Sequence, residues 1–238
     1  MFGPKCSSRS CFAVIAAGLL SVGMVRLVCA EGHARRNAIS YASASRVGMP
    51  APNWVPRSRD GMDMVGKPAP AWGDLDWLNS PPLRLKDLRG KVVLIRFWTN
   101  TCPFCAATAP ALRQIDHDFA RRGVVVIGMY HPKPPGANRS VQEVEQAIHG
   151  WGWRFPVGLD IQWKALQSYW LNGPHRDATS ASFLIDQRGI IRWVHPGPEF
   201  HPGGPADHQQ CRDDYRDLRQ AVEALLAEGG QNRGGRQL

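Results

Sequence analysis

Two cysteines stand three positions apart in the stretch FWTNTCPFCAATAP, where an apolar run meets a helix-like pattern. They are Cys102 and Cys105, and Pro103 and Phe104 separate them. Two thiols at this spacing can supply half of a zinc site, close a structural disulfide, or alternate between dithiol and disulfide in redox catalysis. The rest of the sequence distinguishes between these three uses.

Redox chemistry fits the pair better than metal binding or a structural link. Zinc usually takes four protein ligands, and neither a second Cys-x-x-Cys nor a His-x-x-x-His follows in the sequence. A disulfide across one helical turn closes such a short loop that it would stabilise the fold little. A Cys-x-x-Cys at a strand-to-helix junction within an α/β pattern is, by contrast, typical of a redox-active pair.

The predicted helix after the apolar run would make the first thiol reactive. Cys102 falls in its first turn, beside Thr101 as a candidate N-cap, so the thiolate would face unpaired N–H groups and the positive end of the helix dipole. Such an environment lowers a cysteine pKa from about 8.5 to roughly 3.5–7.5. Pro103 suits the first turn because its missing N–H loses no hydrogen bond. Cys102 would attack a substrate disulfide, and Cys105, one turn later, would resolve the mixed disulfide.

The elements that must position the pair alternate between strands and helices. Residues 91–99 are a β-branched and aromatic run, which predicts a central strand buried on both faces. A helix over 102–122 and a second buried strand over 123–130 follow. Also predicted are a strand near 74–78, helices over 140–151, 162–170 and 213–228, a short strand from 155, and a hairpin over 181–197. This order predicts an α/β sandwich, with a central mixed sheet and flanking helices.

The N-terminus has the three parts of an export signal. Lys5 and Arg9 form a basic region, an apolar run follows to Val25, and small residues precede Glu31 as at a cleavage site. Retention as an uncleaved membrane anchor is the alternative. We therefore divide the chain into a signal peptide or anchor over 1–30, a flexible linker over 31–65, a folded domain over 66–228 and a disordered tail over 229–238.

The charge of the chain does not indicate a nucleic-acid partner. Setting residues 1–30 aside removes Lys5, Arg9 and Arg26, which lowers the formal charge from +9 to +6. The remaining basic residues are scattered and form no dense stripe with interleaved aromatic residues. Three of the six cysteines also lie in residues 1–30, so the rest of the chain keeps one close pair and the distant Cys211. That number is too small for a disulfide-stapled scaffold.

The sequence resembles the thioredoxin superfamily, and within it the exported TlpA/ResA-like thiol-disulfide oxidoreductases. The resemblance covers roughly residues 66–228 and rests on GKPAP (66–70), LRGKVVLIRFW leading into CPFC, Pro110, FPVGLD (155–160) and FLIDQRGIIRWVHPG (183–197). It implies a thioredoxin-like three-layer sandwich, with Cys102 as nucleophile, Cys105 as resolving thiol and Trp98 flanking the site. It also implies cell redox homeostasis in the periplasm, including a part in cytochrome c maturation, with no organic cofactor.

Three positions depart from the pattern of that superfamily. Arg96 stands where thioredoxins carry a buried acid. If its guanidinium is buried near the pair, it would stabilise the Cys102 thiolate. The alternative is that the side chain extends to solvent at the strand edge. Thr108 replaces a glutamate, which leaves the acid–base partner of Cys105 unassigned. Thr179 and Ser180 stand where a cis-proline is expected, and we predict a trans bond there because a non-proline cis bond costs about 2.5–4 kcal/mol.

A loop near the C-terminus holds further metal-ligand side chains. His195, His201, His208 and Cys211 fall within HPGPEFHPGGPADHQQC, but their spacing matches no metal motif and a Gly/Pro-rich loop does not preorganise ligands. We therefore expect solvated loop histidines, with no metal bound. Three roles remain possible for Cys211: a buried free thiol, a third redox partner or an intermolecular disulfide.

We conclude from the sequence that this is an exported or membrane-anchored thiol-disulfide oxidoreductase, periplasmic or otherwise extracytoplasmic. Its expected partners are exported protein thiols or disulfides and a membrane thiol-disulfide electron donor. Two alternatives stay open, a copper- or zinc-binding chaperone that uses the cysteines with the loop histidines, and a thiol peroxidase. Whether the pair reduces, oxidises or isomerises disulfides depends on how stable the Cys102 thiolate is.

Overall fold

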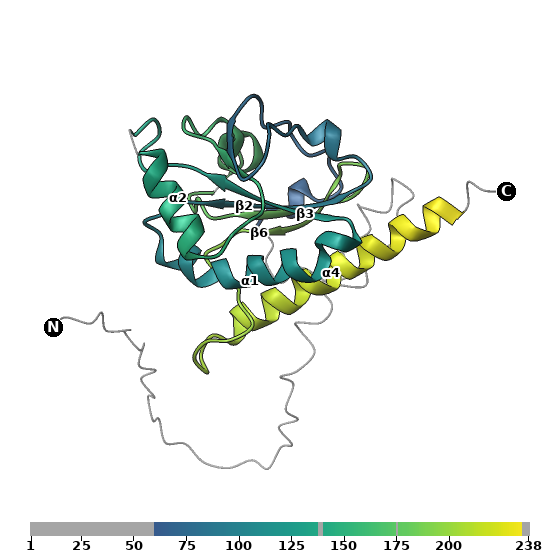
Figure 1. Cartoon of the computed structure of the whole chain (residues 1–238). Coiled ribbons are helices and arrows are strands. Elements are labelled where there is room, and N and C mark those ends of the chain that lie inside the picture. The colour runs from purple at the N-terminus through teal and green to yellow at the C-terminus, as the bar shows by residue number, and fades with distance from the viewer. Residues whose placement is uncertain (1–59, 138–139, 175, 235–238) are drawn as a thin grey trace, which may run out of the picture. The chain divides into compact units, whose positions relative to one another are not determined.

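The computed structural model describes residues 60–137, 140–174 and 176–234 (Figure 1). The predicted signal segment over 1–30 and most of the linker over 31–65 lie outside the described residues. The strands are β1 (Asp76–Leu78), β2 (Val92–Trp98), β3 (Val124–Tyr130), β4 (Val157–Leu159), β5 (Ser182–Ile185) and β6 (Ile191–His195). The helices are α1 (Pro103–Phe119), α2 (Val141–Gly150), α3 (Lys164–Leu166) and α4 (Gln209–Gly234), with short turns η2 (Met62–Met64), η3 (Leu85–Leu88), η4 (Ala120–Arg122) and η5 (Gln167–Leu171).

The strands form one mixed six-stranded sheet in the order β1-β4-β3-β2-β5-β6. β2 pairs in parallel with β3 through the α1 crossover, and β3 pairs in parallel with β4. The β5–β6 hairpin joins the other side of β2 in antiparallel register, and β1 closes the opposite edge. The predicted α/β sandwich with a mixed central sheet is therefore confirmed.

Both faces of the sheet are covered, and the central strand is accordingly apolar at every position except Arg96. All seven residues of β2 are buried. One face packs against α1, α2 and α4 in a core cluster that includes Leu112 and Leu218, and the other packs against α3 and η5 in a cluster that includes Tyr169. Figure 1 shows α1 and α4 lying side by side beneath the sheet. The three layers place the carboxyl end of β2 directly before α1.

The end of the predicted linker belongs to the folded domain. Met64 and Val65 pack against the core cluster between the sheet and α3. Gly66 N–H donates to the Ile191 carbonyl at 2.8 Å. Residues 60–65 are therefore ordered against β6, where the sequence predicted a flexible linker. The few apolar residues of this short stretch give no periodic signal, so the contacts that order it cannot be read from the local sequence.

The C-terminal helix is longer than predicted at both ends. It begins at Gln209, where Gln209 and Gln210 donate to Asp213 and Asp214 one turn ahead, and it continues through Gly234. The prediction of a disordered tail is therefore wrong for residues 229–234. Adding a residue to an existing helix requires far less free energy than nucleating a new one. Because the preceding turns are packed against the sheet, the glycine-rich end can continue the same helix.

The predicted helix over 162–170 is a short α turn that continues as the π turn η5. It begins after Trp163, which has left-handed backbone angles (φ 59°). The buried carboxylate of Asp160 accepts hydrogen bonds from the backbone N–H groups of Ala165 (3.2 Å) and Leu166 (2.8 Å) and so satisfies the start of this segment. None of the helices in the described part of the chain combines the length and apolarity needed to span a membrane.

A buried ion pair fastens α4 to the β5–β6 hairpin. The Arg192 guanidinium lies 3.1 Å from an Asp186 carboxylate oxygen and 2.9 Å from a Glu228 oxygen, and the Arg192 and Asp186 side chains are 4% and 2% exposed. Asp186 also accepts from the backbone N–H groups of Arg188 and Ile190 in the hairpin turn. The pair therefore fixes both the turn and the far end of α4.

We predict that Arg192→Leu lowers the free energy of unfolding by about 3 kcal/mol, because it leaves the buried Asp186 carboxylate with only the exposed Arg188 guanidinium, 3.6 Å away, as a cation. Urea unfolding measures the change. The matched control is Arg122→Leu, which breaks the ion pair between Arg122 and Glu223. These two side chains are 48% and 49% exposed. That variant should lose at most about 1 kcal/mol, and equal losses in both would contradict the role given to burial.

Candidate active site

Cys102 is itself the N-cap of α1. Its backbone is extended (φ −95°, ψ 115°), and its Sγ accepts a hydrogen bond from the Cys105 N–H at 3.2 Å. Pro103 takes the first helical position, as predicted, while Thr101 lies one residue outside the helix and is exposed. The prediction of Thr101 as N-cap is therefore wrong. The chain leaves β2 through Thr99 and reaches the helix one residue later than the polar pattern suggested, so the sulfur takes the capping position.

The two thiols of the pair have opposite environments. The Cys105 thiol, the backbone N–H groups of the first turn and the charge of Arg96 together lower the pKa of Cys102 to about 6, although partial burial opposes them. The hydrogen bond to Cys102 and burial raise the pKa of Cys105 far above its ordinary value. Cys102 therefore ionises near neutral pH while Cys105 keeps its proton, and both are free thiols in the structure.

Arg96 is buried beneath the pair, at 1% exposure on the central strand. Its guanidinium donates to Ser182 Oγ at 3.2 Å and to the Pro198 carbonyl at 2.5 Å, and its charge acts on Cys105 and Cys102. Burial lowers the pKa of Arg96, and the thiols raise it. Of the two interpretations that the sequence left open, the buried charge near the thiols is the one observed. The strand edge is out of reach because β2 has a neighbour on each side.

Trp98 forms the buried wall of the site. Its ring lies 5.1 Å from that of Tyr130, 5.0 Å from that of Trp151 and 5.1 Å from that of Trp153, measured between centroids. Cys102 packs against the same cluster. Trp153 also donates to the Ala109 carbonyl at 3.0 Å, so this indole ties α1 to the aromatic cluster.

The outer side of the site carries one exposed aromatic ring and one buried loop. Phe104, between the cysteines, is 46% exposed. Ser180 is buried beside Gly197, where an added Cβ would come within 3.0 Å of Ser180 Oγ, and Thr179 is half-buried. The cis bonds among the described residues are Lys133–Pro134 and Gly197–Pro198, so the bond between Thr179 and Ser180 is trans, as predicted.

The segment that follows β6 completes the site, and no pattern in the sequence predicts that it does. Phe200 N–H donates to Thr108 Oγ1 at 3.3 Å, and that hydroxyl donates to the Phe104 carbonyl at 2.9 Å. The Phe200 ring lies 5.6 Å from the Arg96 guanidinium, and the Glu199 carboxylate acts on the same cation. Thr108 therefore links the segment to α1. A Gly/Pro-rich stretch carries no periodic signal, so only the tertiary structure brings these groups to the pair.

Comparison with known proteins assigns the family of this chain. The model of the family described as AhpC/TSA matches residues 65–194, which include β2, α1 and the cysteine pair. The chain belongs to the AhpC/TSA family. Within the family it is similar to the thiol-disulfide oxidoreductase ResA of Bacillus anthracis, at 30% identity over 127 residues, which are 53% of this chain and 66% of ResA.

Other relatives of this AhpC/TSA-family chain agree on the fold. Protein DipZ of Mycobacterium bovis is 33% identical over 130 residues, but the match spans 51% of this chain and 17% of DipZ. A solution structure from Bacteroides thetaiotaomicron, provisionally described as a protein disulfide isomerase, has a TM-score of 0.55 at 21% identity and covers 71% of this chain and 94% of its own. A thiol:disulfide interchange protein from Chlorobium tepidum has a TM-score of 0.51 at 22% identity, covering 67% and 95%. The thioredoxin-like fold is thereby confirmed.

The histidines predicted to be solvated are largely buried in this AhpC/TSA-family chain. His195 and His201 are 5% and 8% exposed, and His208 is half-buried. His195 lies 3.3 Å from an Asp214 oxygen and accepts from the Gly197 N–H, while His201 and His208 contact each other. The prediction is wrong for His195 and His201, because α4 and the loop before it fold over them.

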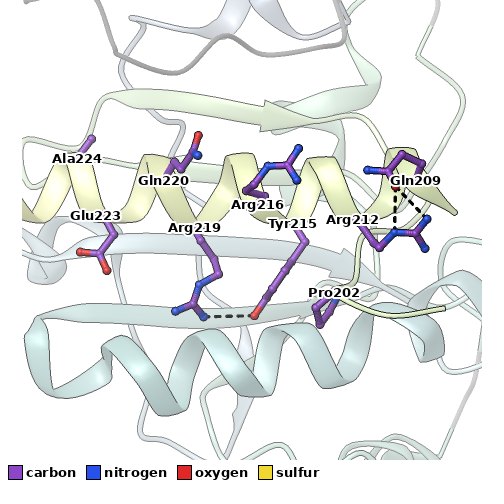
Figure 2. A pocket seen from close by; sticks show the side chains of 9 residues that line it. All are labelled: Pro202, Gln209, Arg212, Tyr215, Arg216, Arg219, Gln220, Glu223 and Ala224. Atoms are coloured by element: carbon purple, nitrogen blue, oxygen red, sulfur yellow. Dashed lines mark hydrogen bonds between the residues drawn. The ribbon is translucent and has the colours of Figure 1, made fainter.

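A surface groove runs along α4. It has a volume of about 820 Å³ and is lined by Pro202, Gln209, Arg212, Tyr215, Arg216, Arg219, Gln220, Glu223 and Ala224 (Figure 2). Neither cysteine of the pair is among these residues. Phe104 is exposed and Cys102 half-buried, so both reach the surface outside the lining of this groove.

We predict that alkylation of Cys102 rises with pH about a midpoint near 6 and is flat above it, because only the thiolate reacts and its pKa is about 6. Cys105→Ala removes the hydrogen bond that contributes most to this pKa, so the midpoint should rise by about one to two pH units. Iodoacetamide labelling followed by peptide mass spectrometry reports Cys102 separately from the other cysteines.

Cys105→Ser is the matched control for that experiment. Its hydroxyl still donates to the thiolate, so its midpoint should stay nearer that of the parent chain than that of Cys105→Ala. A parent midpoint near 8.5, the ordinary value for a cysteine, would show that the N-terminal turn of α1 does not stabilise the thiolate.

Proposed function

We propose that this chain is an exported thiol-disulfide oxidoreductase that exchanges disulfides with protein thiols through Cys102 and Cys105. The observation that carries the proposal is the placement of two thiols one helical turn apart, with the sulfur of Cys102 capping α1 and Cys105 buried behind it. A thiolate of low pKa is a ready nucleophile at neutral pH, and a protonated neighbour is held in reserve for the second step. The names of the ResA and interchange-protein relatives support the same reaction class.

The proposed reaction proceeds in two exchanges. The Cys102 thiolate attacks one sulfur of a substrate disulfide; the substrate S–S bond breaks, a Cys102–substrate bond forms, and the other substrate sulfur leaves as a thiolate. Cys105 then attacks Cys102, which forms the Cys102–Cys105 disulfide and releases the second substrate thiol. Two electrons pass to the substrate, and the Cys105 proton ends on the released thiol, directly or through solvent.

The charge of Arg96 serves both steps of the proposed reaction. In the free dithiol it favours the Cys102 thiolate. In the mixed disulfide Cys102 carries no charge, so the hydrogen bond that keeps Cys105 protonated is lost, while Arg96 still lowers the Cys105 pKa. Arg96 thus acts on Cys105 at the stage when Cys105 must ionise, although Thr108 offers no carboxylate as acid–base partner.

The proposed substrates are thiols and disulfides of exported proteins, including cytochrome c precursors, with electrons returned by a membrane thiol-disulfide partner. Three features support this assignment: the export-like N-terminal sequence, the exposed Phe104 ring beside Cys102, and the resemblance to TlpA/ResA-like proteins. We place the chain in the periplasm or an equivalent extracytoplasmic space. Residues 1–30 would either be removed as a signal peptide or stay as a membrane anchor. No organic cofactor takes part in this scheme.

We predict that the chain, supplied with dithiothreitol, reduces a peptide that carries one internal disulfide, and that Cys102→Ser lowers the rate to that of dithiothreitol alone. Reduced Cys105→Ser, mixed with the peptide disulfide after dithiothreitol has been removed and then quenched with an alkylating agent, should instead hold a mixed disulfide between Cys102 and the peptide, because neither Cys105 nor dithiothreitol is present to resolve it. Intact-mass spectrometry detects the adduct.

Ala106→Ser is the matched control, since it places a hydroxyl on an exposed position of the same helical turn and should keep the parent rate. Full activity in Cys102→Ser would refute the proposal. Faster oxidation of the pair by hydrogen peroxide than by the peptide disulfide would favour the thiol peroxidase alternative instead.

A further inference from the structure

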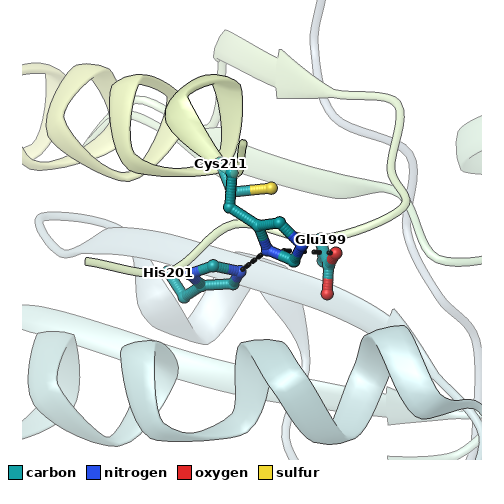
Figure 3. A group of neighbouring side chains, drawn as sticks. Glu199, His201 and Cys211 are labelled. Atoms are coloured by element: carbon teal, nitrogen blue, oxygen red, sulfur yellow. Dashed lines mark hydrogen bonds and ion pairs between the residues drawn. The ribbon is translucent and has the colours of Figure 1, made fainter. Parts of the chain in front are cut away.

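We propose that Glu199, His201, His208 and Cys211 form a zinc site, separate from the cysteine pair and independent of the proposed exchange reaction. One ligand atom from each of the four residues lies within 4.8 Å of those of the others (Figure 3). They come from the segment after β6 and from the first turn of α4. The group includes neither Cys102 nor Cys105; His201, His208 and Cys211 are three of the four loop residues that the sequence singled out, and Glu199 stands in place of His195. The proposal therefore reverses the expectation that this loop binds no metal.

The spacing of the two imidazoles fits a tetrahedral metal ion. His201 Nε2 and His208 Nδ1 face each other at 3.1 Å. Two nitrogens bound to tetrahedral zinc at about 2.0–2.1 Å lie roughly 3.3 Å apart, so the rings need to separate only slightly to admit the ion. The Glu199 carboxylate is 3.9 Å from the same His208 nitrogen, on the side where a further ligand is needed.

A second contact fixes the tautomer of His201. Its Nδ1 lies 2.9 Å from the Gly203 carbonyl, which can only accept, so Nδ1 carries the proton and Nε2 presents its lone pair to the site. A ring N–H held by a backbone carbonyl is the usual outer contact of a histidine that binds metal. His201 is also 8% exposed, so this lone pair is shielded from water.

The loop that carries the ligands is preorganised, against the expectation from its Gly/Pro-rich sequence. Arg212 donates to the carbonyls of Pro205 (2.7 Å) and Ala206 (2.8 Å), and His201 N–H donates to the Cys211 carbonyl at 3.2 Å. Gly204 has φ +88°, and a Cβ there would come within 2.6 Å of the His201 ring. These contacts hold the loop in a shape that brings the four side chains together.

The donor set favours zinc among the common divalent ions. One thiolate sulfur, two imidazole nitrogens and one carboxylate oxygen combine the ligand types that zinc accepts in tetrahedral sites, whereas magnesium and calcium prefer oxygen alone. Four protein ligands leave no open position, so the ion would be structural. It would hold the segment whose Pro198 carbonyl accepts from Arg96.

The test uses the full chain with Cys102→Ser and Cys105→Ser, so that the cysteine pair cannot bind metal. We expect this chain to bind one zinc equivalent more than the same chain with His208→Ala, measured by competition with a chromophoric chelator. Loss of one ligand should weaken this site at least about 100-fold, since even outer contacts change metal affinity by 10–100-fold. The difference cancels any zinc held by cysteines in residues 1–30.

Cobalt substitution provides a second reading that does not depend on affinity. Co²⁺ in the chain with Cys102→Ser and Cys105→Ser should give intense tetrahedral d–d bands and a thiolate charge-transfer band, and adding Cys211→Ser should remove the latter while the chain remains folded by circular dichroism. His117→Ala is the matched control, because that side chain is 81% exposed on α1, and it should bind as the parent does. Equal zinc stoichiometry with and without His208→Ala, or an unchanged cobalt spectrum in Cys211→Ser, would overturn the proposal.

Discussion

A positive charge buried on the central strand is the constraint on which the rest of this structure depends. The guanidinium of Arg96 is removed from water, and polar partners close by must offset the free-energy cost of losing its hydration. Those partners come from separate elements: Ser182 on β5, the Pro198 carbonyl after β6, and the thiols at the start of α1. Burial of one side chain therefore ties the sheet, the helix and the C-terminal loop together.

The same charge explains why the thiols can differ so strongly over one helical turn. The N-terminal turn of α1 alone would favour ionisation of either sulfur that faces it. Cys102 caps the helix and is partly open to solvent, whereas Cys105 is buried and donates to it. A fixed cation beneath both sulfurs stabilises whichever of them carries the charge, and this matches the order of steps in the proposed exchange.

Local patterns in the sequence sufficed for the parts of the fold that depend on local structure. The apolar run of β2, the helical spacing in α1 and the cysteine pair between them were predicted because each is encoded within a few residues. Contacts across long stretches of chain were not predictable in this way. Arg96 meets Pro198 across 102 positions, and nothing near either residue indicates it. The burial of His195 and His201 and the position of Glu199 near Arg96 were not predicted for the same reason. The capping role of Cys102 depends on where β2 ends.

The most direct test of the account is the reduction potential of the Cys102–Cys105 pair in the parent chain and in Arg96→Met, measured in redox buffers by intact mass. If the buried charge stabilises the thiolate, and hence the reduced form, its removal should make the potential more negative by about 30 mV or more, which corresponds to 1.4 kcal/mol. Arg121→Met, an exposed position after α1, should leave the potential unchanged. The same potential in Arg96→Met as in the parent, or a pair that never titrates, would contradict the account.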